Sequence, residues 1–273
     1  MKIYKPLAFG LLLTTVACDS TQDASEAPRA ELAVEINSNA PTEVTTDLGY
    51  NVEVNEVRIA IKDLQFTVSG ETHTASLLQK VSDFVFPVAY AHPGHYEGGE
   101  ITGELKGSFI VDWFDDSSTS LGAGTLIGGE YTAANLFLDR GTEVNGLDAT
   151  DPLIGHTAII SGTATKAGES VDFTFTVDSP EDLQIVGVPF EVEIDSNSNG
   201  TIGLQFVVQN PINEDVDTVF DNIDFISLDS DNDGELLLEP PAEDAEVDDT
   251  VRAYNIFKHK FERHDHFFLT YSE

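Results

Sequence analysis

Residues 52–68 read VEVNEVRIAIKDLQFTV, and the spacing of their apolar side chains indicates the fold class of this chain. Val52 and Val54, and then Val57 and Ile59, each stand two positions apart. Successive side chains of a β-strand point to opposite faces, so apolar residues at every second position predict a strand with one buried face. The stretch is therefore typical of a β-protein.

Shorter alternating patterns on both sides of this stretch extend the prediction to most of the chain. Further strands are predicted around 32–36, at 101–114, 130–139, 156–166, 171–178, 183–194 and 201–209, and in a final segment at 267–271. Two loops carry hairpin signals, Lys166-Ala167-Gly168-Glu169 and the pair Asn199-Gly200. Because no helical pattern separates the strands, we expect an all-β fold, either an antiparallel β-sandwich or an open barrel.

Helix is predicted at only two places, both near the C-terminus. Residues 214–223 place apolar side chains at helical spacing and predict a short connecting helix. A second helix is predicted to start at the capping residues Asp248 and Asp249 and to run to about Lys260. Its basic residues near the end suit the negative pole of the helix dipole.

The N-terminus is typical of an exported, lipid-anchored protein. Lys2 and Lys5 precede an apolar run at 7–13, which is too short to span a bilayer and predicts a cleaved signal peptide. The small residues that end in Cys18 resemble the lipobox of bacterial lipoproteins, although Thr15 stands where that family usually has leucine. The resemblance implies cleavage before Cys18 and a diacylglycerol on its sulfur. The alternative is an ordinary secretory signal with an unmodified cysteine.

These features divide the chain into three parts. Residues 1–17 are the predicted lipoprotein signal peptide, and residues 18–30, which are polar and without periodicity, are a predicted disordered tether. Residues 31–273 are expected to form a single β-sandwich domain, since they show no internal repeat and no clear boundary. The anchor on Cys18 implies a place in the cell envelope, facing the periplasm or the exterior.

The charge of the chain limits its partners. With 13 lysines and arginines against 49 aspartates and glutamates, the formal net charge is −36. Such a field repels nucleic acid and anionic lipid headgroups and attracts cations and basic surfaces. We therefore expect no nucleic-acid partner. Contact with a membrane is expected through the lipid on Cys18, and an envelope protein is a further candidate partner.

A histidine turn is the sharpest candidate site. In the segment His92-Pro93-Gly94-His95, proline and glycine occupy the central positions of a type II turn, so the two imidazoles start within about 7 Å of each other. Imidazole nitrogens suit Zn²⁺ or Cu²⁺, and Glu97 or Glu100 is expected to add a carboxylate oxygen. His264 and His266 are expected to share one face of the last strand, and either to complete this site or to form a second one with Asp265 and His259. The alternative is a set of solvated loop residues.

A second candidate site is an acidic loop. Asp229, Asp231 and Asp233 are followed by Gly234, a spacing that directs alternate carboxylates to one Ca²⁺. Pro240 stands where an EF-hand has its bidentate glutamate, so the sequence predicts either a calcium loop of another type or a plain acidic turn.

Catalysis is not expected, because the chain has no GxSxG, P-loop, GxGxxG or HExxH motif and its one cysteine is the predicted lipidation site. The segment AYAHPGHY at 89–96 is similar to one in a group of uncharacterised bacterial lipoproteins. This resemblance implies an envelope β-protein and transfers no activity. The sequence therefore predicts a lipid-anchored protein that binds or delivers Zn²⁺ or Cu²⁺ without turnover. The alternative is a structural or protein-interaction module, with Ca²⁺ stiffening the loop at 229–233.

Overall fold

The structure is a computed structural model that describes residues 29–39, 41–68, 100–114, 120–210 and 217–273. Its strands are β1 (Arg29–Ile36), β2 (Glu43–Thr45), β3 (Asn51–Val68), β4 (Glu100–Asp112), β5 (Ser120–Ile127), β6 (Gly129–Leu138), β7 (Ala158–Lys166), β8 (Glu169–Val177), β9 (Gln184–Ile194), β10 (Thr201–Phe206), β11 (Glu235–Leu238) and β12 (Phe267–Ser272). Its helices are the 3-10 turns η2 (Glu143–Asn145) and η3 (His264–His266), the short α2 (Phe225–Leu228) and α3 (Asp249–Phe261).

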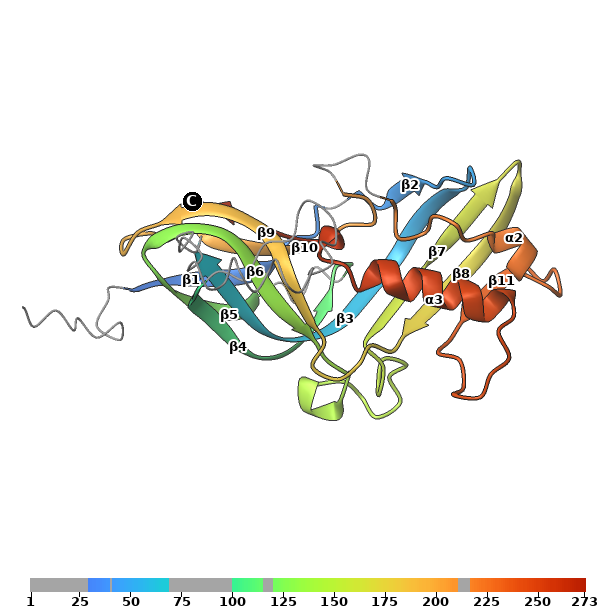
Figure 1. The fold of residues 1–273 in the computed structure, drawn as a ribbon, viewed down its shortest axis with the longest axis horizontal. Helices are drawn as coiled ribbons and strands as arrows, with labels where there is room; N and C mark the ends of the chain where they lie inside the picture. The colour runs from blue at the N-terminus through green and yellow to red at the C-terminus, as the bar shows by residue number, and fades with distance from the viewer. Residues whose placement is uncertain (1–28, 40, 69–99, 115–119, 211–216) are drawn as a thin grey trace, which may run out of the picture.

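Strand β3 organises the whole molecule, because it belongs to two groups of strands (Figure 1). Its first part pairs with β2 on one side and with β7 on the other, and β8 and β11 continue the sheet beyond β7. Its second part pairs with β4 and β6. From β4 the sheet continues through β5, β1 and β10 to β12, and it curls until β12 lies next to β9, the partner of β6.

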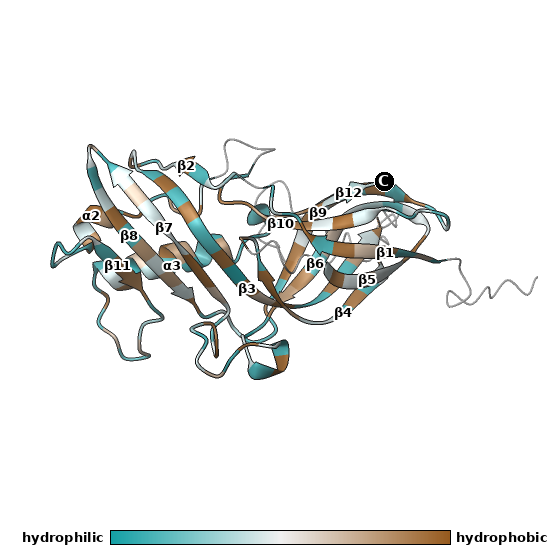
Figure 2. Cartoon of the chain, turned by 180° about the vertical axis from the view of Figure 1, so that it is seen from behind, coloured by the Kyte–Doolittle hydropathy of each residue, from teal (hydrophilic) through white to brown (hydrophobic). Residues whose placement is uncertain are grey.

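Strand β3 does not keep a single alternation of buried and exposed residues along its length, because bulges shift the buried positions from even to odd numbers and back. Val52 and Val54 are buried, and after a register shift between Val54 and Glu56 the buried positions become Val57 and Ile59. A second shift follows Lys62 and returns the buried set to even positions. A bulge adds one residue to a strand and so exchanges the faces of all residues after it. The breaks in the sequence alternation are therefore structural, and Figure 2 shows the banding along this strand.

Helix α3 closes the core beside β7 and β8 (Figure 1). It begins at Asp248, whose side chain accepts a hydrogen bond from the Val251 amide and so satisfies one of the free donors of the first turn. Phe257 faces inward and meets Phe175 of β8 edge to face, with ring centroids 4.7 Å apart. The helix thus covers an aromatic cluster that the sheet alone would leave open to water.

The all-β prediction is confirmed, as are several of its details. The loop 166–169 is a two-residue hairpin between β7 and β8, with Ala167 and Gly168 at positive φ. The helix expected after Asp248 is α3. The sheet is nevertheless mixed, because β1 pairs with β10 and β8 pairs with β11 in parallel. Alternation of apolar residues indicates which face of a strand is buried but not the direction of its neighbour. The sequence pattern therefore could not show that these two pairs are parallel.

The hairpin expected at Asn199-Gly200 is wrong. Strands β9 and β10 do not pair with each other, because β12 from the C-terminus is bonded to β10 and lies beside β9. At Gly200 a Cβ atom would come within 2.3 Å of the Ser272 carbonyl oxygen. This glycine therefore serves a close approach of two chain segments and not a tight turn.

The helix expected at 214–223 is also wrong where the structure describes it. From 217 to 223 the chain forms turns, and the short helix α2 begins only at Phe225. The Asp221 carboxylate accepts hydrogen bonds from both the amide and the hydroxyl of Thr218, and Asn222 has a φ of +66°. Side-chain bonds of this kind compete with helical hydrogen bonds, and a left-handed residue ends any helix.

Candidate functional site

A cavity of about 200 Å³ opens where β3 passes from one group of strands to the other. On the edge of β3 that faces the cavity, the pairing with β2 ends at Glu53. One further hydrogen bond follows, from the Val54 amide to the Thr42 carbonyl. Strand β4 approaches from the other end, where the Trp113 amide donates to the Val57 carbonyl. Between Val54 and Val57, no strand of the described residues pairs with this edge of β3, whose other edge is paired with β7, and the cavity lies in this gap.

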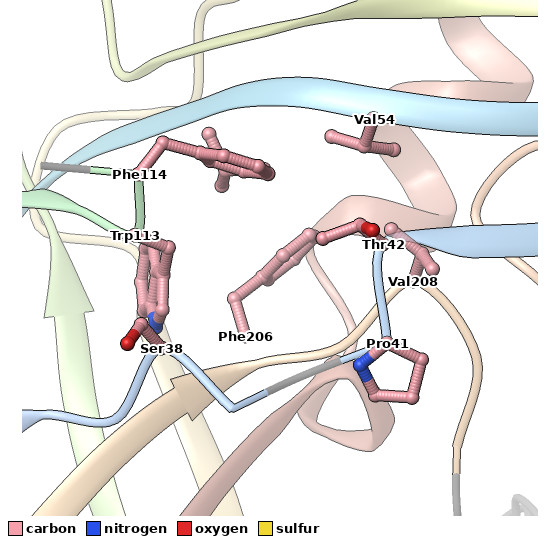
Figure 3. Close-up of a pocket in the computed structure, with 9 residues that line it drawn as sticks. Ser38, Pro41, Thr42, Val54, Trp113, Phe114, Phe206 and Val208 are labelled. Atoms are coloured by element: carbon pink, nitrogen blue, oxygen red, sulfur yellow. The ribbon is translucent and has the colours of Figure 1, made fainter.

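The walls of the cavity come from four segments, and most of them are apolar (Figure 3). The lining residues are Ser38, Pro41, Thr42, Val54, Val57, Trp113, Phe114, Phe206 and Val208. Figure 3 shows the aromatic side chains of Trp113, Phe114 and Phe206 around the open space, with Pro41 and Thr42 on the far side. None of these described lining residues carries a charge. Ser38 and Thr42 contribute the side-chain hydroxyls of the lining.

The two buried aromatic walls are held in place by their neighbours. The Trp113 indole nitrogen donates to the Leu204 carbonyl over 3.3 Å, so the ring cannot turn out of the wall. Its centroid lies 5.9 Å from that of Phe206 at an interplanar angle of 49°. Phe206 in turn packs against Phe261 and Phe267, at 5.9 and 5.4 Å. A wall built in this way is preorganised, since little freedom remains to be lost when a ligand binds.

Phe114 differs from the other walls because 42% of it is exposed. It directly follows the nearly buried Trp113, and its amide donates to the Asp112 carboxylate. An aromatic ring at the rim of an apolar cavity exposes area that a bound group would cover, and covering such area is favourable.

The structure places two of the five predicted transition-metal ligands. His264 and His266 lie in the 3-10 turn η3 and not in the extended strand, so they do not share the strand face that we expected. His266 is 1% exposed, and its Nδ1 lies 3.0 Å from the Val207 carbonyl oxygen. Burial lowers the pKa of His266 to about 4, so the ring is neutral and Nδ1 is the donor. Only Nε2 remains for any other contact.

His264 is partly exposed, and its Nε2 lies 3.3 Å from the Asp265 carboxylate. The remaining predicted ligands, His92, His95 and Glu97, lie outside the described residues, as does the predicted lipidation site Cys18. The transition-metal site therefore stays a prediction.

The acidic loop lies between α2 and β11. Its three carboxylates, from Asp229, Asp231 and Asp233, each place an oxygen within 4.8 Å of the others. Asp229 is buried, and its two oxygens already accept from the amides of Asp233 and Gly234. The loop is thus closed by its own hydrogen bonds, and exposed acidic groups often cluster without an ion. Calcium binding here also stays a prediction.

Among the described residues, neither α2 nor α3 combines the length and the apolarity of a bilayer-spanning helix. The chain matches no protein-family model, no curated protein and no solved structure.

The cavity was not predicted from the sequence. Its residues lie in four segments far apart in the chain, and Val54, Trp113 and Phe206 each look like ordinary core positions. One signal was present, since Trp113 is the sole tryptophan and is followed by a second large aromatic residue at a predicted strand end.

Proposed function

We propose that this protein is a lipid-anchored binding module of the cell envelope, which takes an apolar group into the cavity beside Trp113 and Phe206 and performs no turnover. The observation that carries the proposal is the cavity itself, with two aromatic walls fixed by their neighbours and an exposed aromatic residue at its rim. Binding sites are usually preformed concave regions with mostly apolar walls and few polar groups.

The cellular setting of the proposal rests on the sequence. The predicted signal peptide and the lipobox-like Cys18 support a location outside the cytoplasm, in the periplasm or on the exterior. The apolar group then comes from a free molecule in that compartment or from an envelope protein.

The test uses the chain with Cys18→Ala, which needs no detergent that would compete for an apolar cavity. Hexan-1-ol and cyclohexylmethanol are titrated while the emission of Trp113 is followed, because this sole tryptophan lines the cavity. We expect a saturable change in emission. Emission that drifts linearly with either alcohol, without saturation, would reject the proposed site.

A matched pair of variants ties the signal to the cavity. Thr42→Leu adds bulk to an exposed lining position, and Thr45→Leu makes the same change at an exposed position three residues away that does not line the cavity. Binding should weaken in the first variant and persist in the second. Equal affinities of the two variants for the alcohols would show that the alcohols bind outside this cavity.

The sequence supports a second candidate, binding of Zn²⁺ or Cu²⁺ through His92 and His95. It rests on the turn expected at Pro93-Gly94, which would bring the two imidazoles together, with Glu97 or His264 as a further donor, whereas His266 is buried and bonded to the Val207 carbonyl.

A further inference from the structure

We propose that the natural ligand of the cavity is a small, neutral molecule built on a single aromatic ring. This inference rests on the proposed function and names its ligand class. It follows from four properties of the cavity, namely its size, its lack of charge, the arrangement of its aromatic walls and its surroundings.

Size sets the first limit. The cavity holds about 200 Å³, whereas sites for drug-sized ligands usually hold about 300–1,000 Å³. An apolar cavity of about 150 Å³ is sufficient for benzene. The space beside Trp113 therefore accepts one ring with a small substituent and is too small to enclose a nucleotide or an oligosaccharide.

Charge sets the second limit. The described lining contains no ionisable side chain, so a charged ligand would lose its hydration without gaining an ion-pair partner, and only a cation would recover part of this cost on the aromatic faces. The net charge of −36 also repels anions at long range. A neutral ligand avoids the loss of hydration and the long-range repulsion, and a single hydroxyl on it could bond to the hydroxyl of Ser38 or of Thr42, which lie on different walls of the cavity.

Ring geometry favours an aromatic over an aliphatic ligand. Trp113 and Phe206 are in contact with each other, with centroids 5.9 Å apart at an angle of 49°, and both line the cavity, so a ligand ring would pack beside an existing aromatic pair. Aromatic pairs prefer such tilted or edge-to-face arrangements, and each good contact strengthens binding by roughly two- to tenfold beyond the area buried. Phe114 supplies a third ring at the rim.

The surroundings favour a free molecule over the side chain of a partner protein. Seven large apolar residues of the described chain are exposed, and of these only Phe114 lines the cavity. Large exposed apolar patches mark protein interaction sites, and the other six exposed residues do not line this cavity. A small molecule needs only the cavity.

The experiment compares five ligands by the emission of Trp113, excited at the red edge of its absorption, in the chain with Cys18→Ala. Benzyl alcohol, benzoate and benzylammonium carry the same aromatic ring and differ in charge. Cyclohexylmethanol has a ring that is not aromatic, and hexan-1-ol has no ring. We expect benzyl alcohol to bind about tenfold more tightly than either charged ligand and several-fold more tightly than the two aliphatic alcohols.

The outcomes separate this inference from the proposed function. Equal binding of benzyl alcohol and the aliphatic alcohols would overturn the aromatic ligand class and leave the apolar site intact. Tightest binding of a charged ring would overturn neutrality. No saturable binding by any ligand would reject the proposed function together with this inference.

Variants give a second readout. Phe114→Ala removes a rim ring that is already 42% exposed, so it should fold normally, and it should weaken benzyl alcohol more than hexan-1-ol. Leu237→Ala is the control, since Leu237 is 61% exposed and does not line the cavity. Equal weakening of both ligands by Phe114→Ala would contradict a specific role of the ring.

Discussion

Replacing Lys260 by methionine should destabilise the protein far more than the same change at Lys258, two residues earlier in α3. Lys260 is 6% exposed, and its ammonium donates to the carbonyl oxygens of Thr218 and Asp221 over 3.2 and 3.0 Å. These bonds tie α3 to the turns at 217–223, whose Phe220 is packed on Phe257. Lysine is rarely buried unless it is paired in this way.

The magnitude follows from the bonds that are lost. A hydrogen bond to a charged group contributes about 1.5–3 kcal/mol, so two bonds contribute about 3–6 kcal/mol. Methionine leaves the Asp221 carbonyl without this donor, while the Thr218 carbonyl keeps a bond from the Asp221 amide. The variant also no longer has to bury an ammonium group, which offsets part of the loss. We expect the free energy of unfolding to fall by about 2–4 kcal/mol. Lys258 makes a partly exposed ion pair with Glu262 at 3.7 Å, and its loss should cost below about 1 kcal/mol.

Urea unfolding followed by circular dichroism measures both variants. The midpoint of Lys260→Met should fall by about 1 M or more, and that of Lys258→Met should stay close to the wild-type value. Equal midpoints for the two variants would refute the assignment of Lys260 as the link between α3 and the 217–223 turns.

The remaining predictions concern pH and metals. The pKa of His266 is lowered from 6.5 to about 4 by burial, so the unfolded chain takes up this proton first, and stability should fall as the pH drops from 6.5 towards 4, by up to about 3 kcal/mol. The His266→Leu variant should lose this part of the pH dependence. Parallel profiles of unfolding free energy against pH for the wild type and the variant would contradict the prediction. Calorimetric titration with Zn²⁺ and Cu²⁺ should give heat with the wild type and little with His92→Ala/His95→Ala, and equal heats would reject the histidine turn. Calcium at about a hundredfold excess over its Kd should stabilise the wild type by about 2.7 kcal/mol in thermal unfolding. The Asp231→Asn/Asp233→Asn variant should lose this gain, whereas a gain of the same size in both would exclude the acidic loop.

Much of the fold could be predicted from local pattern. Alternation located most of the central strands, and the Asp248 cap located α3, because each of these signals depends on residues a few positions apart. The errors have a different origin. Strand β12 takes the place beside β10 that an Asn199-Gly200 hairpin would have given to β9, and no local pattern reports competition from a segment some 70 residues away.

The candidate sites divide in the same way. The sequence by itself determined the acidic charge, the predicted anchor at Cys18 and the two proposed metal motifs, since spacing along the chain is enough to define each of them. Only the tertiary structure decided that His266 is a neutral core residue, and that Val54, Trp113 and Phe206 surround one cavity. The physical reason is that burial and cavities arise where distant strands meet or fail to meet, and the gap along β3 between β2 and β4 exists only once both strands have paired with it.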